Sequence, residues 1–168
     1  FNGKQGFGVK NHPNTLPIDL GAGGRNLNLA TSTNGVLIRA EFQFIRDALR
    51  ITNAVMGQVT FYVSRTILSN MEQAWNSANA SNVTVLDMVR KLEGVADVKE
   101  DASLTGNQVI ALVLDSMYIR PLVGMATGTY AVPRQMFNSK YSFYAANAVG
   151  LEIRKDATGK SAVAYASS

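Results

Sequence analysis

His12 is the only histidine in this sequence, so it is the only residue that could supply an imidazole, either as a base or as a metal ligand. The chain has no cysteine, which excludes a thiol nucleophile, a Cys-ligated zinc or iron–sulfur centre and any disulfide. A Ser-His-Asp triad or a histidine-containing metal site would therefore have to use His12. Because this residue lies in a turn between Asn11 and Pro13, we interpret it as structural or exposed. We predict no catalytic residue and no metal site.

Residues 21–25, Gly-Ala-Gly-Gly-Arg, are the segment most similar to a phosphate-binding loop. Glycine lets backbone N–H groups close around an anion, which is the chemistry such a loop needs. The segment lacks the Gly-Lys-Ser/Thr ending, follows no clear strand and has no helix starting directly after it. We interpret it as a loop and expect no nucleotide or other cofactor.

Acidic side chains gather near two predicted turns. Asp97, Glu100 and Asp101 lie near the first, and Glu152 and Asp156 flank the second. Paired carboxylates perform acid–base or metal chemistry only when they converge in a cleft, and nothing in the sequence places these groups in one. They are interpreted as solvated loop charges, and the chain is predicted not to be an enzyme.

Arg39, Arg46 and Arg50 form the most regular charge pattern of the chain, a narrow basic ridge at helical spacing. Two interpretations stay open. The ridge is an ordinary solvated helix face, or it contacts acidic groups of a neighbouring subunit or phosphate. Specific base recognition is not predicted, because no reading element or aromatic stacking platform accompanies the ridge.

The ridge belongs to a helix that the sequence predicts for residues 36–56, because apolar residues recur there at helical spacing over a wide arc. Thr33 or Asn34 can cap its start and Gly57 can end it. The arc has two stripes, Ile38, Phe42, Ile45 and Leu49 in the first and Leu37, Phe44, Ala48, Ile51 and Val55 in the second.

The remaining pattern alternates helices with strands. A second helix starts after Ser64, with an inner face of Ile67, Leu68, Met71 and Trp75, and a third follows a capping box of Thr84 and Asp87 and ends at Gly94. Strands are predicted at residues 58–63, 95–98, 108–114, 127–132, 141–149, 151–155 and 161–166.

Three details of this pattern matter below. The apolar run of residues 108–114 is typical of a strand covered on both faces. Residues 120–133 contain several glycines and prolines and are predicted to turn repeatedly, whereas residues 156–159 are predicted to join the last two strands. Tyr141, Phe143 and Tyr144 are assigned a core and interface role. The order of elements predicts an α+β fold with helices packed on a mixed or antiparallel sheet.

Composition sets wider limits. The 168 residues suit one domain, or one domain with an extended arm. Hydrophobic residues make up 46% and charged residues 17%, so we expect apolar surface that a partner covers. The net charge of +4 favours weak attraction to polyanions. No run of eighteen apolar residues occurs, so no membrane partner is predicted.

Gly6-Phe-Gly-Val-Lys-Asn-His-Pro13, which precedes the predicted long helix, resembles a Gly-x-Gly-Leu-Leu-Asn-x-Pro type segment of major capsid proteins of tailed bacteriophages. Their Hong Kong 97-type shell fold is shared by encapsulins, and the order of elements here is similar. The resemblance implies a spine-like long helix with peripheral and axial subdomains.

The resemblance also implies a domain organisation. Residues 1–35 would form an extended arm, residues 36–63 and 134–168 a peripheral-type subdomain, and residues 64–133 an axial-type subdomain. The arm and extended hairpin that should come before the Gly6–Pro13 motif are missing, and the chain begins without methionine. We therefore expect the sequence to be N-terminally incomplete.

The function implied is that of a structural protein that self-assembles into an icosahedral shell around double-stranded DNA, formed in the host cytoplasm and located in the virion. Its partners would be copies of itself in pentamers and hexamers, DNA bound without specificity, and scaffolding, portal or decoration proteins. Arg39, Arg46 and Arg50 would face the genome or an acidic neighbour. Replacing Arg46 and Arg50 with glutamine should then impair assembly or DNA retention without unfolding the domain. An encapsulin-like compartment shell is the alternative, followed by a small hydrolase or transferase.

Overall fold

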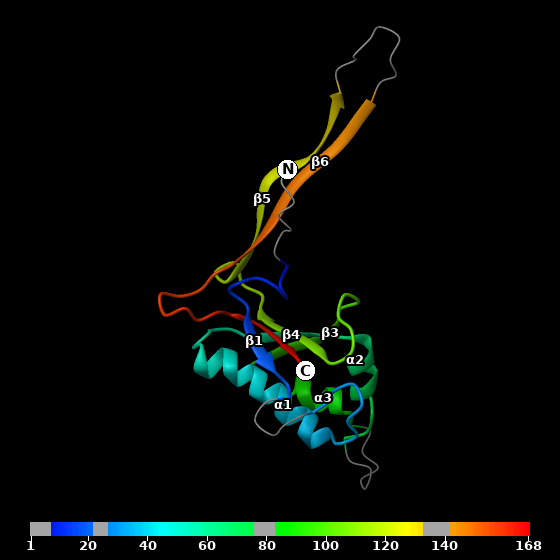
Figure 1. Ribbon diagram of the computed structural model, residues 1–168. Coiled ribbons are helices and arrows are strands. Elements are labelled where there is room, and N and C mark those ends of the chain that lie inside the picture. Colours follow the sequence, from blue (N-terminus) through cyan, green and yellow to red (C-terminus); the bar gives the residue numbers. More distant parts are fainter. Residues whose placement is uncertain (1–7, 22–26, 76–82, 133–141) are drawn as a thin grey trace.

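The computed structural model describes residues 8–21, 27–75, 83–132 and 142–168 (Figure 1). These residues form a body of one sheet and its helices, from which a long two-stranded ribbon projects. Most of the glycine loop at residues 21–25, the first residues of the Gly6–Pro13 motif and Tyr141 lie outside the described residues. The chain is a mixed α+β protein in which the sheet structure dominates, which confirms the predicted fold class at this level.

The sheet of the body has five strands in the order β1-β7-β4-β2-β3. Strand β4 lies antiparallel to β2 and β7, whereas β1 is parallel to β7 and β3 is parallel to β2. The sheet is therefore mixed. The strands are β1 at Leu16–Asp19, β2 at Val59–Val63, β3 at Val95–Glu100, β4 at Gln108–Val113 and β7 at Val163–Ser167.

Helix α1 at Gly35–Asp47 continues as the π-helical turn η2 at Ala48–Thr52. Asn34 caps its start, because the Asn34 side chain accepts hydrogen bonds from the backbone N–H groups of Val36 and Leu37. The prediction of a helix reaching residue 56 is wrong at its end.

The helix stops early because the backbone changes direction at Ala54, which has a φ of 52°. That turn lets Val55 enter the core and starts the approach to β2, and Gly57 follows with a φ of 115°. The resulting helix of 18 residues is shorter than the predicted spine-like helix.

The two shorter helices have the predicted caps. Ser64 accepts from the Ile67 N–H at the start of α2, which spans Arg65–Met71. Thr84 and Asp87 form the predicted capping box of α3, which spans Val85–Arg90. Trp75 was predicted on the inner face of the second helix but lies beyond its end, where it packs beside Gly35.

The helices cover one face of the sheet, and this face forms the main core. Phe42 of α1 meets Phe61 of β2 edge to face, with ring centroids 4.9 Å apart and ring planes at 84°. Leu49, Ile67 and Val89 are fully buried beside them. The three helices therefore share one apolar layer with the sheet.

The opposite face of the sheet has its own smaller cluster. Ile110 and Leu112 of β4 pack there with Val163 and with Ile153 from the base of the ribbon. Since Val109, Ala111 and Val113 point into the main core, β4 is covered on both faces, as predicted. The buried residues of this second cluster are Leu104, Ile110, Leu112, Ile153 and Val163.

The ribbon consists of β5 at Ile119–Val132 and β6 at Ser142–Ile153, paired antiparallel. The strand predicted at residues 127–132 lies within β5, but the repeated turns predicted from residue 120 onward are wrong, because the strand is continuous from Ile119. The two strands predicted at residues 141–149 and 151–155 are one strand that continues through Gly150 to Ile153. The glycines of β5 lie where the register shifts, between Val123 and Gly128, so they accommodate bulges in a continuous strand.

Residues 156–159 do form the predicted turn, in which the Gly159 N–H donates to the Asp156 carbonyl. They do not join a regular hairpin, however. Lys155 and Ser161 form a single bridge, after which the flanking strands diverge, β6 toward β5 and β7 into the main sheet.

The predicted subdomain boundaries do not coincide with the division into body and ribbon. The sheet takes β1 from the predicted arm, β2 and β7 from the predicted peripheral-type segments, and β3 and β4 from the predicted axial-type segment. The assignment of peripheral-type and axial-type subdomains stays a prediction.

Candidate functional site

The residues considered for catalysis are separated in the structure. The His12 ring accepts a hydrogen bond from the Asn14 N–H through Nδ1 at 3.0 Å, so it stabilises its own turn. Asp97 pairs with Arg90 at 3.0 Å, and Asp101 accepts from the Ser103 N–H at 2.8 Å. Among the described residues, no group of three or more acidic, histidine or cysteine side chains could hold a metal ion.

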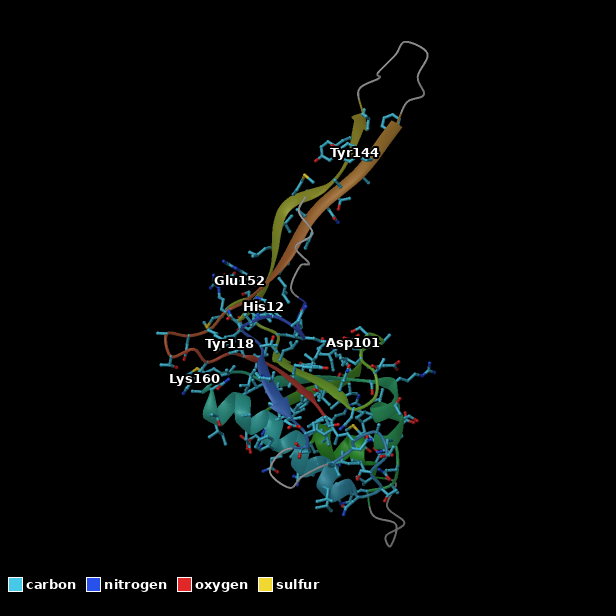
Figure 2. All side chains as sticks on the ribbon, viewed as in Figure 1. His12, Asp101, Tyr118, Tyr144, Glu152 and Lys160 are labelled. Atoms are coloured by element: carbon cyan, nitrogen blue, oxygen red, sulfur yellow. The ribbon has the colours of Figure 1, made fainter. Side chains whose placement is uncertain are left out.

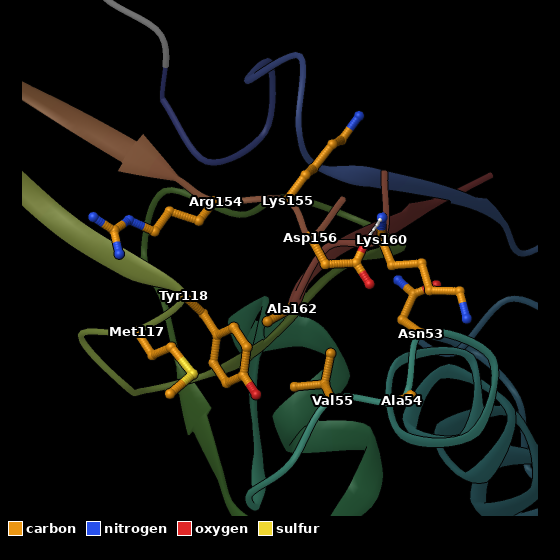
Figure 3. A pocket seen from close by; sticks show the side chains of 10 residues that line it. All are labelled: Asn53, Ala54, Val55, Met117, Tyr118, Arg154, Lys155, Asp156, Lys160 and Ala162. Carbon is orange, nitrogen blue, oxygen red and sulfur yellow. Dashed lines mark hydrogen bonds between the residues drawn. The ribbon is translucent and has the colours of Figure 1, made fainter. Parts of the chain in front are cut away.

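A hollow of about 270 Å³ lies between the end of η2 and the 156–159 turn (Figure 3). Its polar groups already serve the chain's own backbone. Asn53 donates to the Ser161 carbonyl at 2.7 Å, and the Tyr118 hydroxyl accepts from the Met56 N–H at 3.3 Å. In Figure 3 the side chains of Arg154 and Lys160 point away from each other. The hollow therefore lacks convergent groups for chemistry on a ligand.

Asp156, beside this hollow, stabilises the turn that follows it. Its carboxylate accepts from the backbone N–H of Lys160 at 2.8 Å and from the backbone N–H of Thr158 at 2.9 Å. These hydrogen bonds, first of all the one from Lys160, lower the pKa of Asp156 below its ordinary value. The interpretation as loop charges fits Asp101 and Asp156, whereas Asp97 and Glu100 lie in β3 and Glu152 lies in β6, so it is wrong for these three residues.

Arg46 is folded back against the body instead of extending into solvent. Its guanidinium donates to Asp47 Oδ1 through Nε at 2.8 Å and Nη2 at 2.6 Å, and to the Glu93 carbonyl through Nη1 at 2.9 Å. The side chain is only 14% exposed. The guanidinium thus ties α1 to the chain just beyond α3.

The other two arginines of the ridge are also only partly exposed. Arg50 Nη1 lies 3.5 Å from the same Glu93 carbonyl, at the limit of a hydrogen bond. Arg50 also fills the space next to Gly94, where an added Cβ would come within 1.7 Å of it. Arg39 Nε is buried and has no hydrogen-bond partner among the described residues. The three side chains therefore do not form one solvated ridge.

These contacts predict different effects for two otherwise identical substitutions. Arg46→Gln should lower the free energy of unfolding by about 1.5–3 kcal/mol, because it removes charge-assisted hydrogen bonds in a mostly covered place. Arg50→Gln should cost less than about 1 kcal/mol, because it loses only one long contact. Urea denaturation of both variants measures the difference. Equal small losses would contradict the structural role of Arg46.

The exposed face of α1 and η2 carries no charge. Val36 is 59% exposed, Leu37 50% and Ile51 73%. The exposed residues of these two elements, which we call the outer face of α1, are Val36, Leu37, Ala40, Gln43, Phe44, Ile51 and Thr52.

Sequence reasoning missed the outer face because it counted Leu37, Phe44 and Ile51 as part of the covered arc. The width of that arc was the available signal, because a helix lying on one face of a sheet needs an apolar stripe only about 100° wide, or somewhat more, to face the core. Leu37, Phe44 and Ile51 of the second apolar stripe are therefore not needed to fill the core.

The outer part of the ribbon is the second exposed apolar surface. Between Arg120 and Glu152, its described residues include no acidic or basic side chain. Tyr130 and Tyr144 stack across the strands with ring centroids 5.3 Å apart. Figure 2 shows Tyr144 far from the body. Large apolar residues are exposed on it, namely Leu122, Val123, Tyr130, Val132, Phe143, Tyr144 and Val149.

Phe143 is 65% exposed and Tyr144 is 54% exposed, so neither has the core role predicted for it. The prediction failed because an alternating aromatic strand pattern indicates a covered face without identifying what covers it. Their predicted interface role is not decided by this geometry.

The charges of the ribbon are placed at its base, where it joins the body. Glu152 pairs with Arg120 across the strands and lies 3.6 Å from Arg154 Nε. Beside them, Ile153 is buried in the second core cluster. The base is therefore held by an ion pair next to an apolar anchor.

The hydrogen bond from the Arg120 guanidinium is the main cause that lowers the pKa of Glu152 below its ordinary value, and the nearby charge of Arg154 lowers it further. A carboxylate with a lowered folded-state pKa contributes stability above its unfolded pKa, and this contribution is lost as the pH falls through the folded-state pKa. Glu152→Gln should therefore remove part of the acid sensitivity of the ribbon base. Amide hydrogen exchange of residues near 119 and 153 between pH 3 and 7 measures this. An unchanged pH profile in the variant would contradict it.

A family of unknown function (DUF6260) matches residues 1–166. The chain belongs to this family. Among curated proteins, none matches the sequence. The matched residues include both the body and the ribbon.

Three solved structures are similar to this member of the family in fold. The capsid of Myoviridae Phage XM1 has a TM-score of 0.65 at 14% identity, over 97% of this chain and 54% of that one. A virus-like particle from Pyrococcus furiosus has a TM-score of 0.63 at 10% identity, over 95% of this chain and 58% of that one. A structure of Mycobacterium phage Che8 has a TM-score of 0.53 at 14% identity, over 94% of this chain and 54% of that one.

At identities this low, the likeness establishes the fold alone. The chain spans between 54% and 58% of the length of these structures. The expected capsid-like fold is confirmed, whereas the spine-like helix and the subdomains of the expectation are not. No helix among the described residues is long and apolar enough to cross a membrane.

Proposed function

We propose that this protein is a structural shell protein whose copies assemble into an icosahedral particle around double-stranded DNA. The observation that carries the proposal is the fold likeness to a phage capsid and to a virus-like particle, which extends over at least 95% of the chain. Copies of the chain in such a shell would contact one another through repeated heterologous interfaces, which close into rings of five or six copies. On this proposal the protein acts without catalysis, is assembled in the host cytoplasm and resides in the virion.

Two surfaces support assembly independently of the fold likeness. The outer face of α1 and the ribbon expose large apolar side chains, and no charged residue is found on the outer face or among the described ribbon residues between Arg120 and Glu152. Exposed apolar patches of this kind mark interaction sites in soluble proteins. A shell protein needs such surfaces on every copy, because each copy contacts several neighbours.

DNA contact is proposed as non-specific attraction to the basic chain, with a net charge of +4. Among the three arginines, the Arg46 guanidinium is already engaged within the chain. Arg39 and Arg50 are therefore the better candidates for contact with DNA or an acidic neighbour. Scaffolding, portal and decoration proteins are further partners of the proposal.

Electron microscopy of the full-length protein after expression tests the proposal. We expect closed particles that contain nuclease-protected DNA. Particles that hold protein and no DNA would favour the second candidate, a compartment shell, which is compatible with the likeness to a virus-like particle. A stable monomer at high concentration would overturn both shell functions.

A further inference from the structure

Several turns of this protein are closed by a side chain that accepts a hydrogen bond from the backbone N–H two residues ahead. In most of those described, the acceptor is the side-chain oxygen of an aspartate or asparagine, namely Asp19, Asn28, Asp101, Asp115 and Asp156. At residue 12 a histidine takes this position, and its Nδ1 accepts from the Asn14 N–H at 3.0 Å. This turn therefore differs from the others in the acid–base chemistry of its acceptor.

The hydrogen bond to His12 fixes the protonation state of the ring. Because a backbone N–H can only donate, Nδ1 has to present its lone pair, and the hydrogen of the neutral imidazole lies on Nε2. A proton added to this ring can go only to Nδ1, and the resulting imidazolium has no acceptor left. Protonation of His12 and the hydrogen bond from Asn14 therefore exclude each other.

The turn holds residues 8–15 against the base of the ribbon. The Asn14 side-chain amide donates to the Ile153 carbonyl at 2.6 Å, and the Pro13 carbonyl accepts from Lys155 Nζ at 3.3 Å. Figure 2 shows His12 at the level where the ribbon joins the body. Since β1 follows directly after residue 15 and pairs with β7, this segment ties the base of the ribbon to the main sheet.

Charged side chains lie on the segment and on the elements that it contacts, namely Lys10, Asp101, Arg120, Glu152, Arg154 and Lys155. Glu152 is paired with Arg120, and Asp101 accepts from the Ser103 N–H. Lys155 contacts the turn directly, through the carbonyl next to His12. A proton on His12 therefore adds positive charge to the turn that this ammonium group already contacts, and the repulsion adds to the loss of the hydrogen bond.

We propose that His12 is an acid-sensitive latch that holds residues 8–15 on the base of the ribbon. At about pH 7.5 the neutral ring closes the turn and keeps Asn14 on the Ile153 carbonyl. Histidines gain their proton between about pH 8 and 5, so the turn opens in this range. The turns closed by aspartate stay closed, because an aspartate gains its proton near pH 4 or below. The latch lies within one chain, so it does not depend on the proposed shell function.

Amide hydrogen exchange of the full chain tests the latch. Rates are compared as protection factors, so that the pH dependence of exchange itself cancels. One reporter is the Asn14 N–H, which donates to His12, and the other is the Arg154 N–H, which donates to the Tyr118 carbonyl at 2.9 Å and closes the ribbon base. From about pH 7.5 to about pH 5.5, protection of both amides should fall about three- to tenfold, the effect of losing one hydrogen bond.

Variants separate the latch from other effects of acid. His12→Asn offers an oxygen to the Asn14 N–H but does not titrate, so its protection should be equal at both pH values. His12→Phe has no acceptor and should have low protection at both. Glu152→Gln should retain the fall seen in the unmodified chain, because a carboxylate gains its proton at lower pH. Asn14→Ala removes the donor to Ile153 and should lower the protection of Arg154 equally at both pH values.

Each outcome bears on the latch. A fall that persists in His12→Asn would overturn the role of His12. A fall at Asn14 without one at Arg154 would also overturn the latch, because the turn would then open without loosening the ribbon. If His12→Asn does not fold, Asn14→Ala decides in its place. Protection of Arg154 that still falls with pH in this variant would contradict the inference, and protection that is low at both pH values would support it.

Discussion

Replacing Phe61 with alanine should lower the free energy of unfolding of the isolated chain by about 3–5 kcal/mol. Phe61 is fully buried on the central part of the sheet and meets Phe42 edge to face. The substitution removes this aromatic contact and leaves a cavity between α1 and the sheet, which the rigid strands cannot close. Urea denaturation followed by circular dichroism measures the loss.

Phe143→Ala is the matched control for this prediction, because it makes the same change at a site that is 65% exposed. In the isolated chain it should change the free energy of unfolding by less than about 0.5 kcal/mol. Equal losses for Phe61→Ala and Phe143→Ala would mean that the ribbon is packed in the unassembled chain, which contradicts the structure.

Removing residues 122–150 and joining Pro121 to Leu151 through Asn-Gly should abolish particle formation while the body still folds. Pro121 and Leu151 are directly paired in the ribbon, and Asn-Gly forms a two-residue turn that suits antiparallel strands. The Arg120–Glu152 pair and the buried Ile153 are retained. The melting temperature should change by less than about 5 °C, since none of the described residues that are removed is fully buried in the core.

Electron microscopy and circular dichroism of the shortened chain separate the two parts of this prediction. A folded body without particles is the expected result. Particles at the normal yield would show that the ribbon is dispensable for assembly. An unfolded body would show that the ribbon supports the sheet, contrary to the arrangement of the two core clusters.

The sequence was sufficient for features that depend on neighbouring residues. The caps at Asn34, Ser64 and Thr84 follow from side chains that accept backbone N–H groups a few positions ahead. The covered strand at residues 108–113 follows from its uninterrupted apolar run. Local chemistry of this kind is read directly from the order of residues.

Features that depend on distant pairing could not be predicted in the same way. The glycines of β5 predict turns when the segment is considered alone, and only pairing with β6 makes bulges of them. The sequence also placed β7 in a hairpin with residues 151–155, although it pairs with β1 and β4. Strand partners far apart in the sequence leave no local signal.

The candidate surfaces illustrate the same limit. The arginines at residues 39, 46 and 50 have helical spacing, but spacing alone does not reveal that Glu93 and Asp47 offer them partners. The apolar outer face was visible in the sequence as an arc wider than the core needs. Its exposure became apparent only once the sheet was seen to cover one side of α1.

The position of β7 determines the order in which this protein can be completed during translation. β7 lies between β1 and β4, yet residues 163–167 are synthesised after every residue of the ribbon. Until they emerge from the ribosome, β1 has no strand to pair with and β4 has one open edge. A chain that stops at the ribbon therefore cannot join β1 to the sheet. Interrupted translation products would lack a finished body, and the unpaired edge of β4 would make them prone to aggregation.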